Sequence, residues 1–199
     1  AAFDDASCDR SDTVSFGDGT VTMESSSNEV SLLLSHGTFE NDVVLTIEML
    51  SRDTFGTGYQ GGLALFFTTA DTDFADPTLH VNTNAYNSFD QYVVGTLKDK
   101  VHATIDHTWM TLHSKDLSGT SVAQNGGDSY KNTGGFLRLE RRNGSIFASH
   151  SPNGSSFQPV GSAVELPDGL KSVKLRIGIR VSNNWNSSYK MTFRPTIEE

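Results

Sequence analysis

The sequence predicts an all-β protein, an antiparallel two-sheet β-sandwich or jelly roll. Apolar residues alternate with polar ones in short runs, which is the period of a β-strand. Clusters of Gly, Asn, Asp and Ser separate these runs, as turns require. No segment shows the apolar stripe and capping residues of a long helix. Short strands joined by turns, without long helices, are typical of sandwiches and jelly rolls.

The first expected strand, 43–50, is rich in β-branched residues and ends at a polar turn. Further strands are expected at 63–68, 91–97, 100–105, 108–113, 136–142, 145–149, 173–181 and 189–193. The stretch 114–133 is the longest polar segment, and we expect it to form a surface loop.

The strongest local signal is a β-hairpin at 136–149. Asn143-Gly144 separates its two alternating runs, and both residue types tolerate the positive φ angles of a tight turn. The odd-numbered residues of the first run, two leucines and Arg141, share one face of the strand. Because leucines fix their face to the core, Arg138 and Glu140 are expected on the opposite face. They form there either an ordinary solvated surface or a ligand contact.

Residues 135–157 combine a Leu-Arg-Leu strand, a tight turn, a Ser-x-Asn-Gly turn and an aromatic residue, Phe157. This pattern resembles the concanavalin A-like (laminin-G-like) jelly-roll superfamily, and within it the small β-sandwich domains found alone or appended to secreted glycoside hydrolases. In those domains Trp is more usual at the position of Phe157. The match is tightest over 135–160 and looser over 43–193. The resemblance implies one concanavalin A-like β-sandwich domain over 1–199, in a secreted or extracellular protein.

The composition argues against several kinds of partner. Lys and Arg number 15 against 24 Asp and Glu, a net charge of −9. Nucleic acids and anionic membranes attract basic surfaces, so neither is expected to be a main partner. No apolar run approaches the ~20 residues of a membrane span, so no membrane insertion is expected. The single cysteine, Cys8, excludes an internal disulfide and a cysteine-based zinc site. The oligomeric state is not set by any pattern in the sequence.

Two polar segments, 183–189 and 82–92, have the residues that bind sugars. Saccharides stack on flat aromatic faces, and amide, carboxylate and guanidinium groups bond their hydroxyls. In the first segment Trp185 stands among amides and hydroxyls in a turn, where it either faces a ligand or folds back over the core. The candidate ligand-binding residues are Trp185, Asn183, Asn184, Tyr86, Asn84, Tyr92, Arg138 and Glu140.

A calcium site is predicted at Asp71, Asp73 and Asp76. These residues place three carboxylates within six positions between two expected strands. Calcium prefers oxygen ligands from a flexible loop. The alternative is an acidic turn held by side-chain to backbone hydrogen bonds and ended by Pro77.

Three functions remain open, and the leading one is a non-catalytic carbohydrate-binding, lectin-like domain whose partner is a glycan or polysaccharide. The second is a polysaccharide-active enzyme, a hydrolase or lyase, with His102, Tyr92, Arg138 and Glu140 on a concave face. The resembling glycanases carry a Glu-x-Asp-x-x-Glu spacing, which none of the expected strands has. The third is a protein-binding adhesion module.

Overall fold

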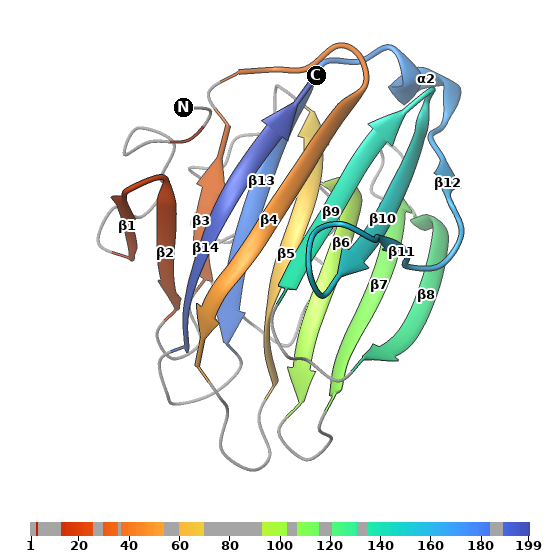
Figure 1. Cartoon of the computed structure of the whole chain (residues 1–199). Coiled ribbons are helices and arrows are strands. Elements are labelled where there is room, and N and C mark those ends of the chain that lie inside the picture. The colour runs from red at the N-terminus through yellow and green to blue at the C-terminus, as the bar shows by residue number, and fades with distance from the viewer. Residues whose placement is uncertain are drawn as a thin grey trace.

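A computed structural model shows that the chain is an all-β sandwich of two antiparallel sheets (Figure 1). The structure describes residues 3, 13–25, 30–35, 37–53, 60–69, 93–102, 107–115, 121–130, 135–183 and 189–199. Within 93–130 it describes the backbone. In the described part of the chain, no helix is long and apolar enough to cross a membrane.

The first sheet, here called sheet I, contains both the earliest strands and the last strand of the chain. Its order is β1 (Val14–Gly17), β2 (Thr20–Ser25), β14 (Tyr189–Glu198), β4 (Val43–Arg52), β9 (Gly135–Arg142), β10 (Ser145–Ser151) and β11 (Gln158–Pro159). The two-residue strand β12 (Val164–Glu165) also pairs with β10. A single helical turn, α2 (Asp168–Lys171), follows β12.

The second sheet, sheet II, lies behind sheet I in the view of Figure 1. Its order is β3 (Val30–Leu34), β13 (Leu175–Asn183), β5 (Gln60–Thr69), β6 (Val93–His102), β7 (His107–Lys115) and β8 (Ser121–Tyr130). Consecutive strands β5 to β8 pair as neighbours, whereas β13 returns from late in the chain to separate β3 from β5.

Alternate residues of both sheets meet in one core. Leu45 and Leu139 of sheet I and Leu65 and Ile179 of sheet II belong to this buried cluster, and all four are fully buried. Burying each such side chain contributes about 1.5–3 kcal/mol relative to leaving it in water. The period-two pattern that predicted the strand at 136–142 therefore also predicted which face of β9 packs inward.

The predicted hairpin at 136–149 is confirmed. Arg142 pairs with Ser145 across the turn, and Asn143 and Gly144 have φ angles of 49° and 71°. A second tight turn of the same kind, at Asp18-Gly19, joins β1 to β2, with φ angles of 49° and 73°. Strands β1, β2 and β3 are not among the strands expected from the sequence, and the expected runs 91–97 and 100–105 overlap one continuous strand, β6.

The prediction of a loop over 114–133 is wrong for residues 114–115, which end β7, and for residues 121–130, which form β8. This strand pairs with β7 and is the last strand of sheet II. A strand at the edge of a sheet needs little apolar side-chain surface, since backbone hydrogen bonds to one neighbour hold it. The sequence of 121–130 is polar and contains glycine, so its pattern did not predict this edge strand.

Candidate ligand-binding surface

Arg138 lies on the outer face of sheet I and is held in one orientation by two contacts. Its Nε donates to Thr46 Oγ1 of the neighbouring strand β4 at 3.1 Å. Its Cζ stands 3.6 Å from the centre of the Phe157 ring, a cation–π contact. The outward position of Arg138, between the buried residues Leu137 and Leu139, is the one that the alternation of β9 predicts.

In the described part of the chain, Arg138 has no carboxylate partner, whereas several other basic residues have one. Ion pairs with a carboxylate are formed by Arg142 with Glu140, by Arg194 with Glu48, by Lys171 with Glu165 and Asp168, and by Lys174 with Glu40. Among the residues that the structure describes, the guanidinium nitrogens Nη1 and Nη2 of Arg138 therefore keep their donors for solvent or a ligand.

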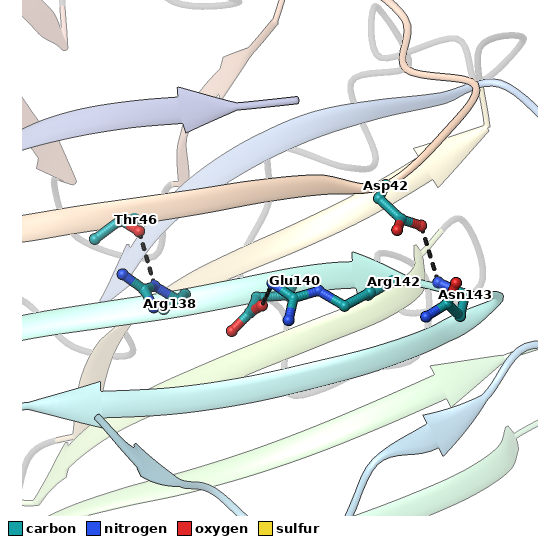
Figure 2. A network of polar contacts seen from close by, with 6 residues as sticks. All are labelled: Asp42, Thr46, Arg138, Glu140, Arg142 and Asn143. Carbon is teal, nitrogen blue, oxygen red and sulfur yellow. Dashed lines mark hydrogen bonds and ion pairs between the residues drawn. The ribbon is translucent and has the colours of Figure 1, made fainter. Parts of the chain in front are cut away.

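Glu140 stands two residues along the same face and is neutralised locally. Its Oε2 accepts from Arg142 Nη2 at 2.8 Å, and 14% of its side chain is exposed. At the end of the strand, the backbone N–H of Asn143 donates to Asp42 Oδ1 at 2.8 Å. Figure 2 shows these contacts in a line along β9, so acidic and basic groups alternate on this face.

An exposed aromatic ring completes this surface. Phe147 of β10 pairs directly with Glu140 across the hairpin, and 38% of the residue is exposed. Residues paired across antiparallel strands point to the same face, so Phe147 and Glu140 are neighbours on the outside of sheet I. Phe147 is not among the ligand-binding residues predicted from the sequence, although its place in an alternating run opposite Glu140 was the available signal.

Arg141, in contrast, points into the protein and acts as a structural cation. It donates to the backbone carbonyls of Phe39 (3.2 Å), Val173 (3.0 Å) and Lys171 (2.6 Å), with a longer contact to Leu170 (3.5 Å). The last two carbonyls belong to α2, whose carboxyl end attracts cations. Burial lowers the pKa of Arg141 from its ordinary value, yet an arginine stays protonated near neutral pH.

The outer face of sheet II is covered over three of its strands. Leu32 of β3, Ala64 and Phe66 of β5 and Arg180 of β13 are at most 6% exposed, although they alternate with residues of the shared core. Phe66 pairs with Gly178, and a Cβ on that glycine would overlap the Phe66 ring. The uninterrupted apolar runs Leu32–Leu34 and Leu63–Phe67 are thus buried on both faces, so this area is not an open ligand surface.

The structure does not bring together all of the predicted ligand-binding residues. Asn183 ends β13 in sheet II, where its backbone pairs with Gly61, whereas Arg138 and Glu140 lie on the outside of sheet I. Five further ligand-binding candidates lie outside the described residues: Trp185, Asn184, Tyr86, Asn84 and Tyr92. The three predicted calcium ligands, Asp71, Asp73 and Asp76, also lie outside them. Their roles stay predictions.

The constellation considered for an enzyme is not assembled. His102 ends β6 in sheet II, where it pairs with Gln60. Arg138 and Glu140 belong to the other sheet and face away from the shared core. Tyr92 lies outside the described residues.

The calcium prediction also rests on residues that the structure does not describe. Within the described ranges, no three His, Cys, Asp or Glu residues are grouped as metal ligands would be. Calcium binding by Asp71, Asp73 and Asp76 therefore remains a prediction from their spacing.

Comparisons with known proteins place this architecture among solved lectin-like structures. No protein-family model matches the chain, and no curated protein sequence matches it. The legume lectin-like domain from Entamoeba histolytica superposes with a TM-score of 0.64 at 12% identity, covering 94% of this chain and 86% of that domain.

Two further structures give the same result. The exoplasmic/lumenal domain of VIP36, in a Ca²⁺/Man-bound form, has a TM-score of 0.58 at 13% identity and covers 92% of this chain and 80% of its own. The carbohydrate-binding module CBM66 from Bacillus subtilis has a TM-score of 0.51 at 13% identity and covers 94% and 91%. At such identities the likeness concerns the fold, and the chain has the concanavalin A-like jelly-roll fold of these lectin-like domains.

Proposed function

We propose that this chain is a secreted, non-catalytic carbohydrate-binding domain. The observation that carries the proposal is the two-sheet architecture, which superposes over 92–94% of the chain on a lectin-like domain, a Man-bound lumenal domain and a carbohydrate-binding module. A fold by itself hosts many functions, so the chemistry of the surface has to support the same conclusion.

The described surface offers that chemistry. The outside of sheet I presents an exposed aromatic ring, a guanidinium with free donors and a carboxylate on rigid paired strands. These groups stack on sugar rings and bond their hydroxyls. The net charge of −9 favours neutral ligands over anionic polymers.

The segments around Trp185 and Tyr86 are proposed as the main glycan contacts. Both aromatic residues stand beside amides and hydroxyls in the sequence. Trp185 falls between β13 and β14, and Tyr86 falls between β5 and β6. Calcium held by Asp71, Asp73 and Asp76 is proposed to order the second of these segments, which follows the three aspartates directly.

A glycan array probed with the full chain tests the proposal, first in calcium and then with a chelator. We expect retention on one class of glycan, loss of this retention in Trp185→Ala with little change in melting temperature, and weaker retention after chelation. Retention that survives the chelator would remove calcium from the proposal. A folded protein that binds no glycan would remove carbohydrate binding itself.

An assay for polysaccharide turnover tests the non-catalytic part separately. Reducing ends report hydrolysis, and the ultraviolet absorbance of unsaturated products reports lyase action. We expect neither signal on any glycan that the chain retains. Turnover that disappears in Glu140→Gln or Tyr92→Phe would show an enzyme instead.

A further inference from the structure

The outside of sheet I holds a compact group of four residues on the β9–β10 hairpin. Arg138 pairs with Ser149, and Glu140 pairs with Phe147. Alternate residues of one strand lie on the same face about 7 Å apart, because each residue rises ~3.3–3.4 Å. The Arg138, Glu140 and Phe147 side chains therefore border one area of the size of a sugar ring.

We propose that this area, here called the hairpin subsite, binds a neutral saccharide unit across Phe147, Glu140 and Arg138. The proposal rests on the carbohydrate-binding function above and adds a second contact surface to it. The surface lies on sheet I, whereas the segment that contains Trp185 begins where β13 of sheet II ends.

Each of the three residues has a distinct task in the hairpin subsite. Phe147 supplies an exposed ring on which the C–H face of a sugar stacks. Arg138 donates from Nη1 and Nη2, while Phe157 and Thr46 hold the rest of the guanidinium in place. Glu140 accepts from a hydroxyl through carboxylate lone pairs that its single bond to Arg142 leaves free. Because these contacts already fix the polar groups, binding orders few side chains.

The balance of charge favours a neutral ligand over an anionic one. Arg138 and Arg142 face Glu140 and Asp42 on this part of the sheet, so the two positive charges offset the two negative ones. A carboxylated or sulfated sugar would gain the Arg138 contact and meet the Glu140 charge beside it. A neutral hexose meets no such repulsion.

A protein partner fits this area less well than a sugar does. Among the described residues, the large hydrophobic side chains that are exposed are Phe147 and Leu50. Leu50 sits at the irregularity in the pairing of β4 with β14, away from the hairpin. A protein interface normally buries ~800 Å² on each partner around several apolar anchors, and one ring among charged groups does not supply them.

The test measures glycan affinity for a set of matched variants of the full chain, using a glycan that the array retains. Phe147→Ala removes the exposed ring, and Arg138→Lys removes the planar guanidinium that stacks on Phe157. We expect each to weaken binding about fivefold or more. Phe147→Tyr keeps an aromatic ring at this position, so it should bind more tightly than Phe147→Ala. Leu50→Ala removes an apolar side chain of similar exposure from another strand, 43% against 38% for Phe147, and should leave binding unchanged. Melting temperatures establish that each variant is folded.

The outcomes separate the two proposals. Weakening by Phe147→Ala and Arg138→Lys, with tighter binding by Phe147→Tyr than by Phe147→Ala and with binding preserved in Leu50→Ala, supports the hairpin subsite. A wild type that binds glycan with the same affinity as Phe147→Ala and Arg138→Lys overturns the subsite and leaves the carbohydrate-binding function in place. A wild type that binds no glycan overturns both.

Discussion

Replacing Arg141 by Met is expected to destabilise the protein by about 4 kcal/mol. The methionine side chain keeps the unbranched stem but removes all five N–H donors. The carbonyls of Phe39, Val173 and Lys171 then lose their charged partner inside the protein. Hydrogen bonds with a charged donor contribute about 1.5–3 kcal/mol each, and a buried acceptor left without a partner costs about 1–3 kcal/mol. The 3.5 Å contact to Leu170 adds little, given its length.

Chemical denaturation of the Arg141→Met variant measures this loss, and thermal unfolding checks it. For a domain of this size, about 4 kcal/mol corresponds to a decrease in melting temperature of about 8–16 °C. Arg142→Met is the matched control, because Arg142 is the next residue on β9 and its side chain is 55% exposed in its ion pair with Glu140. That change should cost at most about 1 kcal/mol. A loss under about 1 kcal/mol for Arg141→Met would refute the idea that this cation ties α2 and the segment before β4 to sheet I.

Four smaller effects are expected. Gly178→Ala should destabilise the fold by about 1–3 kcal/mol in denaturation, and by less in a Phe66→Leu background, because the added methyl overlaps the Phe66 ring; equal costs in both backgrounds would contradict this. A double-mutant cycle on Arg138 and Phe157 should give a coupling of about 0.5–1 kcal/mol from the cation–π contact, and additive losses would speak against it. Ser149→Ala should leave stability unchanged or raise it slightly, since the buried Ser149 Oγ has no hydrogen-bond partner among the described residues; a clear loss would reveal a partner. Lys171 lowers the pKa of Asp168 below its ordinary 3.8, so their ion pair stabilises the folded state above that pH. This stabilisation is lost as the pH falls through the lower folded-state pKa, so the melting-temperature difference between wild type and Asp168→Asn should shrink in acid. A difference that grows in acid would contradict this direction.

Local chemistry was enough to predict the β9–β10 hairpin. Asn143-Gly144 fixes a two-residue turn, and the alternation on either side fixes which residues face the core. The same reasoning applies to Asp18-Gly19 between β1 and β2, where the signal was present but the flanking runs are short. Predictions succeed here because the turn and both strands are adjacent in sequence.

Features that depend on distant partners could not be predicted in this way. Alternation places Arg141 on the core-facing side of β9, but its acceptors come from carbonyls up to 102 residues away. The strand at 121–130 forms because β7 offers an open edge, and its own side chains carry no apolar pattern. Burial of β3 and β5 on both faces likewise depends on what covers sheet II. The candidate site shows the same contrast between local and distant signals. Strand alternation was enough to place Arg138 and Glu140 on the outer face, while Phe147 and Phe157 became relevant through strand pairing and packing.

Affinity electrophoresis is the most direct test of carbohydrate recognition by this fold. The full chain is run through native gels that each contain one soluble neutral polysaccharide, beside a gel without polysaccharide and a non-binding reference protein. We expect at least one polysaccharide to retard the chain relative to the reference protein, as carbohydrate recognition requires. Equal mobility in every gel, for a chain whose thermal unfolding shows that it is folded, would contradict it.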